Sequence, residues 1–251
     1  YLTTLSHLRL ASSDNGIDFE VHNDKNIFGL GDHETFGIED CRVTHIDGTY
    51  FLTYTAVSDN GYGVGMISTT NWSDFHRHGI IISGPNKDCA FFNEQINEKY
   101  YCLHRPSMTI VGGNDIWLAQ SSDLEHWGKH QCIARTRPGM WDSVRIGAGA
   151  SPIKTEKGWL EIYHGADEDN RYCLGALLLD LADPSRVIAR SKEPILEPEM
   201  AYEKSGFFGN VVFTNGHIVD GDKITLYYGA SDEFICAARL SIAEILNVLQ
   251  S

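Results

Sequence analysis

The sequence predicts an all-β protein, a five-bladed β-propeller whose first blade is incomplete. The first observation is a repeat, because a turn followed by an aromatic, alternating strand recurs at residues 47–54, 97–104, 157–164 and 221–228. The second is local composition, since β-branched and aromatic residues bounded by Gly, Asn, Asp and Pro are typical of short strands. The third is that a helical pattern appears only near residues 241–246.

A second recurring unit lies between the copies of the first. It joins a strand to a small polar turn and an aromatic residue, at 11–19, 69–72 and 121–127. Equivalent positions are roughly 50 to 65 residues apart, which is the length of a four-stranded propeller blade with long loops. The spacing therefore predicts that each repeat forms one blade.

Four complete units are visible, and the segment before them is similar to the tail of another blade. An unpaired sheet edge is a liability for a protein. We therefore expect an N-terminal piece of the natural protein, about 50 to 80 residues by the repeat length, to lie outside this chain. No linker or low-complexity tract divides residues 1–251, so we expect them to form a single β-propeller domain.

Charge and composition exclude several classes of function. The 251 residues carry a net charge of −14, which argues against a nucleic-acid partner. No run of 18 apolar residues is present, so no membrane-spanning helix is predicted. The six cysteines are scattered without a Cys-x-x-Cys pair, which favours reduced thiols in a cytoplasmic protein over a zinc site or a disulfide framework.

Two adjacent carboxylates and an arginine stand at the start of an expected strand, within residues 37–43: Glu39, Asp40 and Arg42. Neighbouring strand residues point to opposite faces. We therefore predict that Glu39 and Asp40 do not face the same pocket, so that one is catalytic while the other caps or pairs. Arg42 would share the face of Asp40 and hold its carboxylate. A structural Asp–Arg turn is the alternative.

Arg145 is a charged residue in an apolar, strand-like setting between Val144 and Ile146. A buried charge needs a partner or an anion. The small residues at 147–150 let the backbone run close to a ligand or to the propeller axis. An arginine that reaches solvent past a strand edge is the alternative.

Three further donors occur near equivalent strand ends. Arg105 and His164 end two of the repeat strands, and Lys87 precedes the strand of Arg105. Because equivalent strand ends converge on the axis of a propeller, we expect Arg105 and His164 to face one cavity. Alone, a strand-end histidine is compatible with a structural role and a loop lysine with a solvated one. Together with Arg145, these groups provide what phosphate recognition requires.

Seven ordered motifs resemble glycoside hydrolase family 130. They lie at residues 37–43, 104–106, 145–149, 158–165, 178–185, 210–213 and 227–232, and the similarity runs from about residue 8 to the C-terminus. The resemblance implies a catalytic domain with five blades. It also implies either a β-mannoside phosphorylase or a β-1,2-mannosidase.

Residue by residue, the resemblance implies that Asp40 is the single catalytic acid, which protonates the leaving oxygen through the 3-hydroxyl of the mannose. The phosphate-binding set would be Lys87, Arg105, Arg145 and His164. The expected substrate-binding residues are Arg42, Asn86, Asp88, Tyr163, Asn210 and Asp232. The chain departs from the family pattern at Cys41, where proline is usual, and at Phe208-Gly209, where Val-Pro is frequent.

Physical chemistry distinguishes the two reactions. An inverting hydrolase needs a second carboxylate to activate water, whereas a phosphorylase must hold a phosphate dianion, for which cationic side chains are suited. We therefore predict inverting phosphorolysis of β-mannosides to α-mannose 1-phosphate, with β-1,2-mannobiose or oligomannosides as the first choice of substrate and β-1,4 linkages as the second.

Inorganic phosphate would be a co-substrate, and neither a metal nor an organic cofactor is implied. A β-1,2-mannosidase of the same family is one alternative function. A non-catalytic mannoside-binding propeller is another. The resemblance also leaves a homo-oligomer open, because family members are often homo-oligomers.

Overall fold

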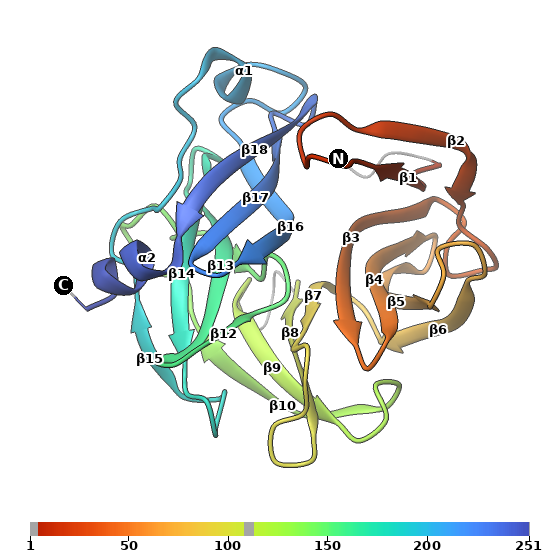
Figure 1. The fold of residues 1–251 in the computed structure, drawn as a ribbon, viewed down its shortest axis with the longest axis horizontal. Coiled ribbons are helices and arrows are strands. Elements are labelled where there is room, and N and C mark those ends of the chain that lie inside the picture. The colour runs from red at the N-terminus through yellow and green to blue at the C-terminus, as the bar shows by residue number, and fades with distance from the viewer. Residues whose placement is uncertain (1–4, 108–112, 251) are drawn as a thin grey trace.

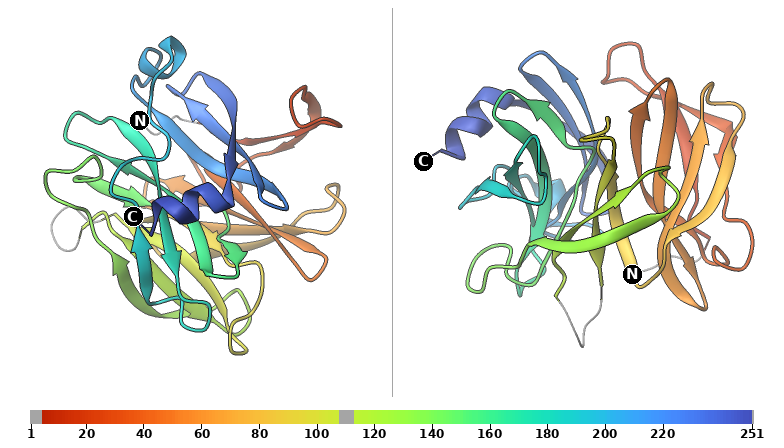
Figure 2. Two further views of the ribbon diagram at one scale, coloured as in Figure 1. Left: turned by 60° about the vertical axis from the view of Figure 1, so that its left-hand side comes forward. Right: turned by 90° about the horizontal axis from the view of Figure 1, so that it is seen from below.

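The structure is a computed structural model that describes residues 5–107 and 113–250. Its strands form four blade-like sheets around a common centre, together with a two-stranded sheet (Figure 1). The all-β prediction is confirmed. Among the described residues, helix is limited to α1 (Ala201–Lys204) and α2 (Ile242–Val248), and α2 covers the helical pattern expected near the C-terminus. Figure 2 shows α2 on the outside, away from β3 to β6. No helix in the described part of the chain is long and apolar enough to span a membrane.

The blade-like sheets are antiparallel, and neighbours in sequence pair with each other except in the third, where β11 and β12 both pair with β13. The first blade contains β3 (Gly37–Ile46), β4 (Thr49–Ser58), β5 (Gly61–Thr69) and β6 (His76–Ile82). The second contains β7 (Asn86–Phe91), β8 (Tyr100–Pro106), β9 (Ile116–Ser121) and β10 (Trp127–Ala134). The third contains β11 (Arg145–Gly147), β12 (Ile153–Thr155), β13 (Gly158–Ala166), β14 (Tyr172–Leu179) and β15 (Val187–Arg190). The fourth contains β16 (Val212–Asp220), β17 (Lys223–Ala230) and β18 (Phe234–Ser241).

The prediction of five blades is wrong for the described residues. Strands β1 (Leu8–Ser12) and β2 (Glu20–Ile27) pair with each other in a two-stranded sheet, which lies between β18 and β3 in Figure 1. Most side chains of β2 are exposed, so this ribbon lacks the two buried faces of a blade. It is joined to the fourth blade by Tyr227, whose hydroxyl donates to the carbonyl of Gly16 at 2.8 Å.

The second recurring sequence unit forms the same polar turn three times. Asn15, Asn71 and Asp123 each accept main-chain N–H bonds from the residues two and three positions later. In the first two blades this turn joins the third strand to the fourth. The ribbon β1–β2 therefore has the turn of an outer strand pair, which explains why the sequence suggested the tail of a blade.

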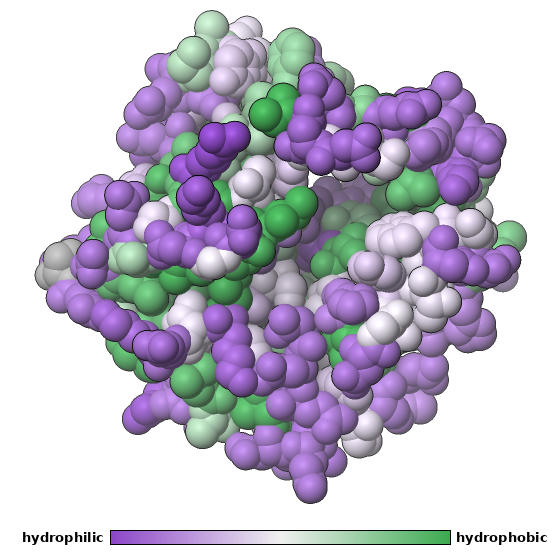
Figure 3. All heavy atoms as spheres, in the orientation of Figure 1, coloured by the Kyte–Doolittle hydropathy of each residue, from purple (hydrophilic) through white to green (hydrophobic). Residues whose placement is uncertain are grey.

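The core lies between neighbouring blades, and β13 is buried along its whole length. Alternation of side chains explains how one strand serves two interfaces. Trp159 and Tyr163 pack in the cluster shared with the second blade. Leu160 and Ile162 point the other way, into the cluster shared with the fourth blade. Near the centre, β3 contacts both β7 and β16. Figure 3 shows a hollow near the middle of the surface, between the sheets.

Two matched glycine substitutions test this packing. A methyl group at Gly175 would lie 2.6 Å from the ring of Trp141 and 2.8 Å from that of Tyr163, whereas one at Gly128 would meet no atom within 4 Å. Overpacking costs typically about 1–3 kcal/mol. We expect Gly175→Ala to lower the free energy of unfolding in urea by that amount and Gly128→Ala to change it by less than about 0.5 kcal/mol. Equal effects of the two would contradict the packing described.

Candidate active site

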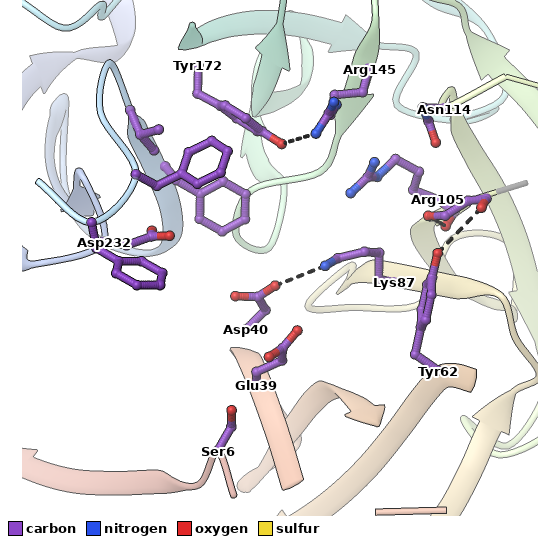
Figure 4. A pocket seen from close by; sticks show the side chains of 15 residues that line it. Ser6, Glu39, Asp40, Tyr62, Lys87, Arg105, Asn114, Arg145, Tyr172 and Asp232 are labelled. Carbon is purple, nitrogen blue, oxygen red and sulfur yellow. Dashed lines mark hydrogen bonds and ion pairs between the residues drawn. The ribbon is translucent and has the colours of Figure 1, made fainter. Parts of the chain in front are cut away.

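A pocket of about 690 Å³ lies where residues of all four blades meet (Figure 4). It combines carboxylates, cations, hydroxyls and aromatic rings. Its lining residues are Ser6, Glu39, Asp40, Tyr62, Lys87, Arg105, Ser107, Asn114, Arg145, Tyr172, Phe207, Phe208, Val211, Phe213 and Asp232.

Five of the predicted site residues line this pocket: Asp40, Lys87, Arg105, Arg145 and Asp232. They come from four separate blades. The Lys87 ammonium lies 3.4 Å from a carboxylate oxygen of Asp40. Figure 4 shows Asp40, Glu39 and Asp232 on one side of the pocket, with Lys87, Arg105 and Arg145 extending from the other. The pocket thus has an acidic side and a basic end.

Glu39 lies on the same pocket wall as Asp40, so the prediction that the two carboxylates face apart is wrong. The pairing of β3 with β4 slips between Glu39 and Arg42, which is a β-bulge. Asp40 has a φ of 54° there. The extra residue breaks the alternation of side chains, and aspartate is among the residues that adopt this left-handed conformation most readily.

The electrostatics of the acidic side oppose further negative charge. Burial, followed by the neighbouring Asp40, raises the pKa of Glu39 to about 7. Burial and then Asp40 also raise the pKa of Asp232. Near neutral pH, the carboxyl of Glu39 is therefore partly protonated and able to donate a hydrogen bond.

The basic end is held in its charged form. Burial opposes the charge of Lys87, but Asp40 and Asp88 outweigh it and raise the pKa of the ammonium. Arg145 donates to the Tyr172 hydroxyl at 2.9 Å. Its guanidinium lies 5.6 Å from the centre of the Tyr172 ring. Arg145 therefore has protein partners while it lines the pocket.

Arg42 does not contact the pocket, contrary to the expected substrate contact. It is fully buried. Its guanidinium donates to the main-chain carbonyl of Asp40 at 2.8 Å, to that of Gly149 at 2.8 Å and to that of Ala148 at 2.9 Å. The expectation that it holds the carboxylate of Asp40 is wrong, because the bulge turns the carbonyl and not the side chain of Asp40 toward Arg42.

The other predicted site residues are not among those lining the pocket. His164 and Asp88 are buried behind the wall. Tyr163 is also buried, and its hydroxyl donates to Asp142 at 2.8 Å. Asn86 faces a second hollow, where its side-chain oxygen lies 3.1 Å from Nδ1 of His104. Asn210 uses its carbonyl to accept the main-chain N–H of Tyr172. Because neighbouring strand side chains point to opposite faces, Asn86 and Lys87 line different hollows. Tyr163 packs in the core cluster that is shared with the second blade.

Sequence reasoning missed several lining residues, including Tyr62, Asn114, Tyr172 and the pair Phe207–Phe208. The sequence does contain a signal for Phe207–Phe208, because this aromatic pair lies between two glycines. A methyl group at Gly206 would lie 2.8 Å from the carbonyl oxygen of Ser231, and one at Gly209 would lie 2.7 Å from that of Lys204. The glycines let this aromatic loop pack closely beside Asp232.

The blade-like sheets around a central pocket that combines carboxyl groups with cations define a propeller-like protein with a candidate active site. A family model described as β-1,4-mannooligosaccharide phosphorylase matches residues 2–251. The chain belongs to glycoside hydrolase family 130.

The similar proteins include phosphorylases of Listeria innocua and of Thermoanaerobacter. A β-1,2-mannobiose phosphorylase of Listeria innocua is 47% identical over all of this chain and 70% of its own length. A 1,2-β-oligomannan phosphorylase of Thermoanaerobacter is 44% identical over 96% of this chain and 80% of its own. The structure of the Listeria innocua β-1,2-mannobiose phosphorylase in complex with β-1,2-mannobiose superimposes with a TM-score of 0.96, at 46% identity, over 97% of this chain and 69% of that one.

Another similar structure comes from work on family 130 glycoside hydrolases that target β-1,2-mannosidic linkages. It has a TM-score of 0.83 and 26% identity, and the match covers 94% of this chain and 75% of that one.

The raised pKa of Glu39 predicts a specific dependence of stability on pH. The folded state keeps its proton up to about pH 7, while an unfolded chain loses it near the ordinary value of 4.5. The unfolded state therefore binds fewer protons in this window, and stability falls as the pH rises. We expect Glu39→Gln to remove this component, about 1–2 kcal/mol after solvent screening. Urea unfolding at pH 5 and pH 8 measures it, and parallel losses in wild type and variant would refute it.

Proposed function

We propose that the chain catalyses the inverting phosphorolysis of β-mannosides, with Asp40 as the catalytic acid. The observation that carries the proposal is that Lys87, Arg105 and Arg145 reach one pocket that also contains Asp40. We propose β-1,2-mannobiose and β-1,2-oligomannosides as the preferred substrates, as the names of the similar phosphorylases suggest, and that residues 1–251 act as one catalytic unit.

The basic end supports phosphate as the nucleophile. Three cationic side chains can neutralise a dianion and hold its oxygens in a fixed orientation. Figure 4 shows Arg105 reaching into the pocket from the side opposite Glu39. Around a water molecule, the same charges would lower the pKa of a carboxylate base and weaken it.

The reaction then proceeds by a single displacement. A phosphate oxygen attacks the anomeric carbon of the mannose, and the bond from that carbon to the leaving oxygen breaks on the opposite face. Asp40 supplies the proton that the leaving sugar takes up, through the 3-hydroxyl of the mannose as the family resemblance implies. The products are α-mannose 1-phosphate and the shortened sugar. Asp232, which lines the acidic side, would accept hydrogen bonds from the hydroxyls of the mannose.

A β-1,2-mannosidase is the second candidate, because the pocket contains carboxyl groups besides Asp40. Glu39 and Asp232 both line it, and an inverting hydrolase needs a second carboxylate opposite the acid. However, Glu39 is the chain neighbour of Asp40 on β3, and both extra carboxyls lie on the acidic side (Figure 4). The position facing Asp40 is occupied by cations, which favours phosphate over activated water.

Omission of phosphate distinguishes the two reactions. We expect the enzyme to convert β-1,2-mannobiose to mannose and α-mannose 1-phosphate only when phosphate is present. Product formation is followed by ³¹P NMR, which also reports the anomeric configuration, and by an assay for free mannose. Mannose release at the same rate in phosphate-free buffer would assign the enzyme to the hydrolases.

Substitution of the acid tests its role against a matched control. Loss of a general acid typically costs about 10²- to 10⁴-fold in rate, so we expect Asp40→Asn to lower kcat by that factor. Asp47→Asn is the control, because Asp47 also has a left-handed backbone, with φ 47°, and lies exposed at the turn after β3. Steady-state kinetics should show wild-type kcat for the control. Substantial activity in Asp40→Asn would remove Asp40 from its proposed role.

A further inference from the structure

Asp88 is a carboxylate with 1% exposure that lies directly behind the basic end of the pocket. One of its oxygens accepts a hydrogen bond from Nε of Arg105 at 2.6 Å and lies 3.3 Å from Nε2 of His164. The other oxygen accepts from Arg42 at 3.2 Å. Burial opposes the charge of Asp88, but Arg105, followed by His164 and Arg42, keeps its pKa well below the ordinary value. Asp88 is therefore an anion within the protein.

The contacts of Asp88 connect the two functional ends of the pocket. Arg42, which pairs with Asp88, also donates to the carbonyl of Asp40 at 2.8 Å. Arg105, which pairs with the same carboxylate, lines the basic end. Asp88 thus fixes the backbone of the proposed acid and a proposed phosphate ligand relative to each other.

The position of Asp88 is set by its backbone and by a glycine. The pairing of β7 with β8 slips between Lys87 and Ala90, and Asp88 has a φ of 55° in this bulge. A methyl group at Gly147 would lie 2.2 Å from an oxygen of Asp88 and 2.6 Å from the His164 ring. The carboxylate therefore occupies space that only glycine leaves open.

We propose that Asp88 is a positioning residue that aims the guanidinium of Arg105 at phosphate without touching the substrate. The proposal rests on the proposed phosphorylase function and deepens it. An arginine side chain has several rotatable bonds, and holding it by Nε leaves its terminal nitrogens oriented before the anion arrives. Such preorganisation improves affinity because less conformational freedom is lost on binding.

His164 belongs to the same supporting layer. Its ring is completely buried, and burial lowers its pKa, so the imidazole is neutral. Its Nε2 lies 3.3 Å from a carboxylate oxygen of Asp88. The proposal therefore assigns His164 to the support of Asp88 and Arg105, in place of the direct phosphate contact that the sequence suggested.

The chain offers a matched control in Asp142. This aspartate is also fully buried and ion-paired with two arginines, Arg137 at 2.7 Å and Arg190 at 2.5 Å, but it is not among the residues lining the pocket. We expect Asp88→Asn and Asp142→Asn to lose comparable stability, because each removes a fully buried negative charge that pairs with two arginines. Only Asp88→Asn should raise the KM for phosphate, by about tenfold or more. The KM for β-1,2-mannobiose should change by less than about twofold.

A second variant covers the case in which Asp88→Asn does not fold. Gly147→Ala keeps every charge but pushes the carboxylate of Asp88 away, so it should weaken phosphate binding in the same direction. Binding is measured without turnover, as the rise of the unfolding temperature on titration with inorganic phosphate. Asp88→Glu, which keeps the charge, should recover part of the loss.

A wild-type KM for phosphate in Asp88→Asn would overturn the proposal. Where that variant does not fold, wild-type phosphate binding in Gly147→Ala would do the same. The proposal would also fail if Asp142→Asn raised the KM for phosphate as much as Asp88→Asn. A failure of the proposed function would be seen in the wild-type enzyme, which would then show no phosphate-dependent turnover. The titration with phosphate would still test the role of Asp88 in that case.

Discussion

A buried negative charge at Asp88 is the constraint on which the centre of this protein depends. A carboxylate removed from water must be neutralised within the protein, and Arg42 and Arg105 neutralise it from two different blades. Arg42 also binds the carbonyls of Ala148 and Gly149, which follow β11 of the third blade. One ionic cluster therefore joins the inner strands of three blades. Because removal of one partner from such a cluster is costly, stability and pocket geometry are linked.

The two bulges give this cluster its shape. In β3 and in β7, an aspartate adopts a left-handed backbone where the strand pairing slips. In β3 the bulge turns Asp40 into the pocket beside Glu39, while in β7 it turns Asp88 inward and away from Lys87, which lines the pocket. The same kind of bulge on equivalent strands therefore places Asp40 in the cavity in one blade and Asp88 inside the protein, as a counter-ion, in the next.

The repeats of aromatic strands were sufficient to predict the sheets, because alternation and turn residues are local properties of the sequence. They also predicted that Arg105 and His164 face one cavity, since equivalent strand ends meet at the centre, but only Arg105 lines the pocket. The family resemblance assigned Asp40, Lys87 and Arg145 to the same site, and all three line it. The bulge at Asp40 could not be predicted, because an unbroken alternation was assumed there. Burial of Arg42 and His164 depends on partners far away in the chain, such as Gly149 and Asp88, and no local pattern reveals these pairings. The fifth blade was inferred from a segment whose strands form only a ribbon.

The distribution of charge in the pocket supports an anionic co-substrate. Three carboxyls and three cations line the wall, and a fully ionised set would leave no positive excess for a phosphate dianion. The raised pKa values of Glu39 and Asp232 show that the acidic side resists ionisation. Asp88 neutralises positive charge from behind the wall, where it orients Arg105 without occupying the cavity. Protonation of Glu39 as the pH falls toward 7 then leaves the basic end with an excess of positive charge, where the nucleophile would bind.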